Sequence, residues 1–203
     1  MKQRIYIDTS VVGGYFDDEF KDATQRLFKR LQDNEVKFVI SDLLELELIQ
    51  APSHVSELLL KFPGDRFERI ELTQEVMDLA DKSISGKVVG RTSLRDCRHI
   101  ALATINRVDV LASWNFRHLV NLDRIKEYNS VNLTLGYATM KFGHHKSYWI
   151  MATKDKTKAF DAVKMMREIR DKITNETQNM TLDELRKYIA DKLKQSHLKK
   201  IGR

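Results

Sequence analysis

The first 135 residues of the chain alternate between short apolar segments and longer segments in which apolar residues recur every three or four positions. Short apolar runs predict strands, and the longer period predicts helices. The expected strands cover residues 4–7, 36–40, 67–72, 108–113 and 131–135, with 67–72 at a sheet edge. The expected helices start at 17 and 42, cover 54–61, 73–86 and 93–106, and end with 118–128. This alternation predicts an α/β fold, an α/β/α sandwich with a mainly parallel sheet.

The pattern changes after residue 135. Residues 136–150 show no clear period and predict a linker. Within residues 151–203, the segments 159–173 and 181–194 have the composition of charged helices. Thr181 and Glu184 form a Thr-x-x-Glu capping box that marks the start of the last helix. The sequence therefore predicts a folded domain at 1–135, a linker at 136–150 and a C-terminal helical tail at 151–203.

The net charge of +6 lies entirely in the tail. Residues 1–150 carry 21 basic and 21 acidic residues, whereas residues 151–203 carry 14 basic and 8 acidic residues. A basic tail has two interpretations. It binds nucleic acid through the phosphates, or it folds onto an acidic cluster of its own body or of a neighbouring chain.

The composition argues against a secreted or membrane protein. No apolar run approaches the roughly 18 residues that a membrane span needs, and the N-terminal segment has no apolar signal-peptide core. Cys97 is the single cysteine, which excludes an intrachain disulfide and a cysteine-based zinc site. We therefore expect a cytoplasmic protein that does not enter a membrane.

Three acidic residues and one amide, Asp8, Glu47, Asp96 and Asn115, lie at the end of an expected strand or on the helix after one. Open α/β sheets bind ligands at the carboxyl ends of their strands. Oxygen ligands gathered there suit Mg²⁺ or Mn²⁺. Each acid also has a plainer interpretation. Asp8 could cap a turn, Asp96 could form a capping pair with Ser93, and Glu47 could face solvent.

Glu45 and Glu47 share one expected helix but cannot both face one site, because two residues along a helix are roughly 200° apart. Glu47 is the better candidate for the site, since it follows Leu43 and Leu44 by about one turn and these are expected in the core. Neighbouring side chains have supporting or weaker roles. Thr9, Ser10 and Ser113 are expected to orient the ligands, His99 is interpreted as a structural or supporting residue, and Asn115 is a neutral, weaker ligand.

The order of these motifs resembles the PIN domain. It comprises Asp8 at the first strand, Glu47 on the second βα unit, an Arg-Asp-Cys-Arg-His-Ile-Ala-Leu-Ala-Thr helix around Asp96, and a Ser-Trp-Asn turn at Asn115. PIN domains are metal-dependent ribonucleases, abundant as the VapC-type toxins of bacterial toxin–antitoxin pairs. The resemblance covers about residues 1–135 and implies one or two Mg²⁺ ions between Asp8, Asp96 and Glu47. Many members carry Asp where this chain has Asn115, which leaves three charged ligands instead of four.

The tail resembles the small VapB-like antitoxins that are encoded beside such toxins. The similarity lies in residues 158–172 and in the helix that starts at Thr181, and Met151 stands where those proteins begin. The chain therefore resembles a toxin and its antitoxin joined into one polypeptide. The alternative is that 159–173 forms an ordinary accessory helix of one enzyme.

Together these resemblances imply a toxin-like endoribonuclease restrained by its own tail or by that of a neighbour in a homodimer or higher homo-oligomer. We expect the helix at 159–173 to place an apolar stripe in a groove of the body, with Arg167 and Arg170 reaching the acidic site in competition with metal. Removing residues 151–203 should then release activity. The stripe consists of Phe160, Val163, Met166, Ile169 and Ile173.

Two other classes of function remain open from the sequence. In the first, the Asn115 site is catalytically weak or inactive, and the chain is a PIN-like nucleic-acid-binding protein that uses its basic tail and Arg117. In the second, the same carboxylates serve a different α/β hydrolase or phosphatase. A requirement for a divalent ion separates the first from the nuclease, and the choice between phosphomonoesters and RNA separates the second.

Overall fold

A computed structural model describes residues 2–85, 94–115, 122–141 and 160–196. Four parallel strands form one sheet in the order β3-β2-β1-β4, so β3 is the edge strand that the sequence predicts. Ile5 pairs with Phe38 on one side and with Val110 on the other. The strands are β1 (Gln3–Ile7), β2 (Val36–Ser41), β3 (Phe67–Ile70) and β4 (Val110–Ala112).

The sheet is buried on both faces, which explains why its two central strands are apolar runs without polar alternation. Successive side chains point to opposite faces, so each strand contributes to two separate cores. Tyr6 and Val39 belong to one core, whereas Ile5, Ile7 and Phe38 belong to the other. The expected α/β/α sandwich with a parallel sheet is confirmed.

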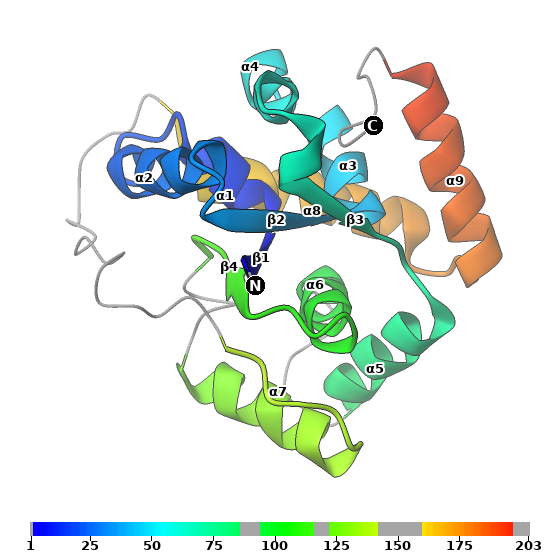
Figure 1. The fold of residues 1–203 in the computed structure, drawn as a ribbon. Helices are drawn as coiled ribbons and strands as arrows, with labels where there is room; N and C mark the ends of the chain where they lie inside the picture. The colour runs from blue at the N-terminus through cyan, green and yellow to red at the C-terminus, as the bar shows by residue number, and fades with distance from the viewer. Residues whose placement is uncertain (1, 86–93, 116–121, 142–159, 197–203) are drawn as a thin grey trace.

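Helices cover the two faces in separate layers. Figure 1 shows α1, α2 and α4 on one side of the sheet, and α5, α6 and α7 on the other. The helices of the body are α1 (Thr9–Gly14), α2 (Lys21–Gln32), α3 (Asp42–Ile49), α4 (Ser53–Ser56), α5 (Gln74–Ser85), α6 (Leu94–Ile105) and α7 (Leu122–Thr134), with short 3-10 helices η1 (Leu58–Lys61) and η2 (Gly64–Arg66). Ser41 caps α3 by accepting a hydrogen bond from the backbone of Leu44.

One expectation about a strand is wrong, and a second is confirmed only in part. The strand predicted at 131–135 is the end of helix α7, and the backbone position beside β4 is taken by Lys141, whose carbonyl accepts a hydrogen bond from Leu111. The strand predicted at 108–113 as buried is a three-residue edge strand in which Val110 and Ala112 are only half-buried. The helix predicted at 118–128 lies partly outside the described residues, as do Met151 and most of the expected linker.

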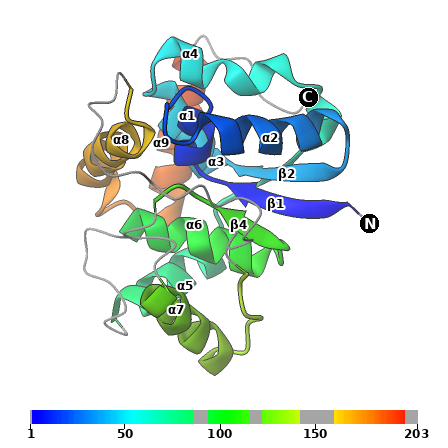
Figure 2. The same ribbon diagram turned by 90° about the vertical axis from the view of Figure 1, so that its left-hand side faces the viewer.

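The C-terminal tail contains two helices, α8 (Ala162–Thr177) and α9 (Leu182–Gln195). The capping box between Thr181 and Glu184 starts α9, as the sequence predicts. Helix α8 packs against α1, α3 and α6, and α9 packs against α3. Figure 2 shows α8 beside α1 and α6, at the end of the sheet toward which β1 runs. None of the helices in these described segments is long and apolar enough to cross a membrane.

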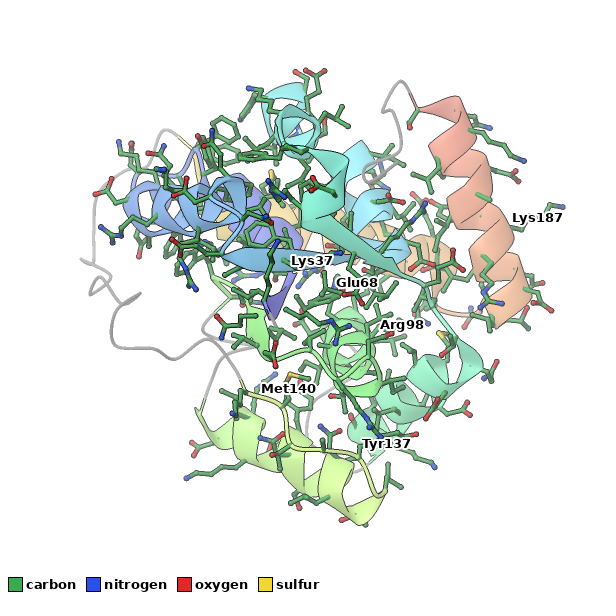
Figure 3. All side chains as sticks on the ribbon, viewed as in Figure 1. Lys37, Glu68, Arg98, Tyr137, Met140 and Lys187 are labelled. Carbon is green, nitrogen blue, oxygen red and sulfur yellow. The ribbon has the colours of Figure 1, made fainter. Side chains whose placement is uncertain are left out.

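The tail helices share the core of the body. Ile169, Ile173, Leu185 and Ile189 are buried in the same cluster as Tyr6. Met166, from the expected apolar stripe, is also buried, while Phe160 and Val163 are half-buried. Charged residues of α9 such as Lys187 point away from the body (Figure 3). The amphipathic pattern of both helices therefore matches the faces that they bury.

Candidate active site

Three of the four predicted ligands meet at the carboxyl end of the sheet. Asp8 follows β1 and caps α1 by accepting a hydrogen bond from the backbone of Val11 at 3.2 Å. Glu47 lies on α3, the helix after β2, and Asp96 lies in the first turn of α6. Asp8 and Glu47 are 0% exposed, and Asp96 is also buried. Three separate elements thus place carboxylates in one buried cluster.

The guanidinium group of Arg170, from α8, lies between these carboxylates. Its Nε donates to Glu47 Oε1 at 2.9 Å, Nη1 donates to Asp96 Oδ1 at 2.6 Å, and Nη2 donates to Asp8 Oδ2 at 3.2 Å. Each nitrogen therefore binds a different carboxylate, so one planar guanidinium group joins acids from three elements. Arg167, the other arginine expected here, is exposed, so only Arg170 reaches the cluster.

Hydroxyl groups hold the Asp8 carboxylate in place. Ser10 donates to Asp8 Oδ1 at 2.5 Å, and Ser113 donates to Asp8 Oδ2 at 2.8 Å. The Thr9 hydroxyl donates to Glu47 Oε2. The three residues expected to orient the acids therefore all contact one of them. These bonds fix the carboxylates before any ligand arrives, which reduces the reorganisation that binding requires.

A buried chain of polar groups holds Glu47 from the other side. His99 Nε2 donates to Glu47 Oε1 at 3.1 Å, because a carboxylate only accepts. The Tyr6 hydroxyl lies 2.6 Å from His99 Nδ1 and 2.9 Å from Ser41 Oγ. The sequence did not predict these roles of Tyr6 and Ser41. A tyrosine in an otherwise aliphatic buried strand was the available signal, since its hydroxyl needs a partner there.

Another arginine, Arg95 on α6, lies close to the cluster. Arg95 Nη1 is 3.7 Å from Glu47 Oε1, and Arg95 Nη2 donates to Thr177 of α8 at 3.3 Å. Arg98 is one turn further along the same helix and is also buried (Figure 3). Glu45 lies away from the cluster and pairs with Arg69, consistent with the helical angle that separates it from Glu47.

Electrostatics keep the cluster charged. Burial alone would raise the pKa of Glu47, but the charge of Arg170, with smaller effects of His99 and Arg95, holds that pKa well below its usual value. Burial alone would lower the pKa of Arg170, but Glu47, Asp8 and Asp96 raise it above its usual value. Carboxylates and guanidinium therefore stabilise each other in their charged forms.

Asn115, the fourth predicted ligand, is 3% exposed and lies two residues after Ser113, whose hydroxyl binds Asp8. Its backbone amide donates to Ser113 Oγ at 3.0 Å. Its side-chain oxygen is buried and has no hydrogen-bond partner among the described residues. A buried amide oxygen without a partner is costly, and an added cation or donor would satisfy it.

Within the described segments, no group of three or more His, Cys, Asp or Glu side chains has the arrangement of a metal site. The space between the three carboxylates holds the Arg170 guanidinium instead. The donor set itself fits a hard divalent cation, since three carboxylates converge on one positive group and an amide oxygen nearby lacks a partner. Arg170 and a cation would therefore bind the same oxygens.

No family model, curated protein or solved structure matches the chain. The layers and the parallel sheet are compatible with a PIN-like sandwich that carries a helical tail. The similarity to PIN domains thus rests on the motifs of the sequence, and the functional assignment rests on the chemistry of the cluster.

Proposed function

We propose that this chain is a Mg²⁺- or Mn²⁺-dependent endoribonuclease whose catalytic centre is blocked by its own C-terminal tail. The observation that carries the proposal is the contact of one tail guanidinium with three buried carboxylates from three elements of the body. Carboxylates at the carboxyl ends of parallel strands are placed where α/β enzymes bind ligands. Three buried carboxylates also require a positively charged partner, either a side chain or a metal ion, because uncompensated charges are costly in the protein interior.

We call the protein closed when the tail is docked and open when the tail has left the body. In the open protein, Asp8, Glu47 and Asp96 would hold a divalent ion, with the Asn115 oxygen available as a further ligand. The ion supplies positive charge for an RNA phosphate and for the negative charge that develops during phosphodiester hydrolysis. Ser10 and Ser113 keep Asp8 oriented, and His99 keeps Glu47 oriented. In the closed protein, Arg170 neutralises the same oxygens and α8 covers them.

This proposal extends to the biological context that the resemblance implies. Residues 1–135 would act as the toxin and the tail as its antitoxin, with RNA as the substrate in the cytoplasm. The tail docks in the same chain here, and exchange of tails between two chains would give a homodimer. Tethering supports docking within one chain, because a linker of this length gives an effective concentration on the order of millimolar.

Full-length variants at two arginines of α8 test the proposal. Arg170→Glu adds a fourth negative charge to the cluster and should expel the tail, so we expect RNA cleavage that requires Mg²⁺ or Mn²⁺ and stops with EDTA. Arg167→Glu is the matched control, because that side chain is exposed on the same helix and the variant should stay inactive. Adding Asp8→Asn to Arg170→Glu should abolish cleavage, and unchanged cleavage would contradict the assignment.

The same experiment separates the runner-up function. The neutral Asn115, which leaves three charged ligands instead of four, favours a protein that binds RNA without cutting it. An Arg170→Glu chain that retains RNA in EDTA and never cleaves it with added metal would support that second candidate. Cleavage of a phosphomonoester in preference to RNA would instead indicate a phosphatase.

A further inference from the structure

Arg95 lies in an environment that the closed structure does not explain. It is 2% exposed, yet its Nε and Nη1 have no hydrogen-bond partner among the described residues. Its nearest acid, Glu47, is 3.7 Å away and already bonds to Arg170 at 2.9 Å. A buried donor without an acceptor is unfavourable, because it has lost its bonds to water without replacing them. The closed form therefore leaves part of this guanidinium unsatisfied.

The tail forms the cover over Arg95. Thr177, near the end of α8, accepts a hydrogen bond from the Arg95 side chain, which makes no other among the described residues. Tyr188 of α9 is close enough to influence the charge of Arg95. Burial lowers the pKa of Arg95, and the charges of Glu47, Arg98 and Arg170 also act on it. When α8 and α9 leave, Arg95 loses its cover and Arg170 at once, and it then faces the space beside the carboxylates.

We propose that Arg95 is the phosphate-binding residue of the open enzyme, and that it binds an RNA backbone phosphate beside the carboxylate cluster once the tail is released. This inference rests on the proposed function. Three carboxylates repel a polyanion, so a body without a nearby cationic donor binds RNA weakly. A guanidinium fork matches two phosphate oxygens, and such charge-assisted bonds are among the strongest in proteins.

Arg98 provides a matched comparison on the same helix. It is as buried as Arg95, and burial lowers its pKa, but the acid that most opposes this effect is Asp81 rather than an acid of the cluster. If Arg95 only balanced buried charge, replacing either arginine would have similar effects on RNA binding. If Arg95 binds phosphate, replacing Arg95 should weaken RNA binding and replacing Arg98 should not.

The test uses full-length Arg170→Glu as the open background and a fluorescent oligoribonucleotide in EDTA, where the metal-dependent cleavage does not occur. Binding is followed by anisotropy across a range of salt concentrations. Adding Arg95→Gln should raise the Kd about tenfold to a hundredfold and reduce the slope of log K against log salt by about 0.7, the value for one phosphate contact on a single strand. Adding Arg98→Gln should change neither quantity.

Arg95→Lys serves as a second variant that keeps the charge and the apolar stem. It should keep the salt slope and raise the Kd, because lysine cannot form the two-oxygen fork. Binding by Arg95→Gln or Arg95→Lys that equals the open background would overturn the role of Arg95 while leaving the nuclease proposal in place. An Arg170→Glu chain that neither binds nor cleaves RNA would overturn both.

Discussion

Replacing Arg170 with alanine should destabilise the closed protein strongly at neutral pH. The substitution removes three hydrogen-bonded ion pairs of 2.6 to 3.2 Å and leaves three buried carboxylates without their main counter-charge. Removing one partner of a buried ion pair costs about 3–5 kcal/mol. We expect a loss of this size in the free energy of unfolding at pH 7. Arg167→Ala, on an exposed surface of the same helix, should change it by about 0.5 kcal/mol or less.

The pH dependence of the loss follows from Glu47. In the wild type its pKa lies below the ordinary value of 4.5, so its contribution is complete above that pH and disappears only in acid. Arg170→Ala removes the charge that most opposes the effect of burial on Glu47, so the pKa of Glu47 rises. The carboxylate then destabilises the fold at pH 7, and protonation relieves this penalty as the pH falls toward 5. The deficit relative to Arg167→Ala should therefore shrink between pH 7 and pH 5.

Urea unfolding of both variants and the wild type at pH 7 and pH 5, followed by circular dichroism, measures these differences. The slope of the free energy against urea should stay similar if the variants keep the same closed fold. A deficit below about 1 kcal/mol at pH 7 would be smaller than any buried pair predicts. A deficit that grows toward pH 5 would show that burial of Glu47 does not control it. Either result would refute the reasoning.

Two further predictions concern release of the tail. A Cβ at Gly13 would lie 3.1 Å from Ala162 Cβ and 3.1 Å from Met165 Cε, so full-length Gly13→Gln should push α8 away and increase its proteolysis while the carboxylates stay intact. Unchanged cleavage of α8 by protease would contradict this close packing. Added Mg²⁺ should stabilise Arg170→Glu by about 2.7 kcal/mol at 100 times the Kd and so raise its melting temperature. The melting temperature of the wild type should not change. Equal shifts in both proteins would mean that the ion binds elsewhere.

The sequence located the cluster because of a general property of parallel sheets. The carboxyl ends of neighbouring strands meet at one edge, so acids that follow β1 and β2 are brought together without knowledge of side-chain positions. The position of Arg170 could be predicted for a similar reason, since the spacing of the apolar residues fixes which face of α8 is buried. It could not be separated from Arg167, because three residues along a helix differ by only about 60° and lie on overlapping faces.

Other features depend on tertiary context that one sequence does not contain. The segment Thr9–Gly14 holds two valines and two glycines, which are poor helix formers, yet it forms α1. Its helix is stabilised by the Asp8 cap and by packing against α8. Alternating apolar residues at 131–135 predicted a strand, but the position beside β4 is taken by Lys141. The role of Arg95 depends on which elements cover it, and so required coordinates.

The cores also decide how firmly the tail is held. Four buried apolar residues of the tail, at about 1.5–3 kcal/mol each, contribute an upper value of about 6–12 kcal/mol to docking; they are Ile169, Ile173, Leu185 and Ile189. A cation at 100 times its Kd gains only about 2.7 kcal/mol, so it cannot displace Arg170 while the apolar contacts remain. In the wild-type chain, where Arg170 keeps its charge, release of the tail thus requires an event that acts on the apolar face of α8 and α9, and the divalent ion follows it. Activity and stability are linked for the same reason. A substitution that releases the tail also removes the apolar residues of the tail from the buried cluster that contains Tyr6.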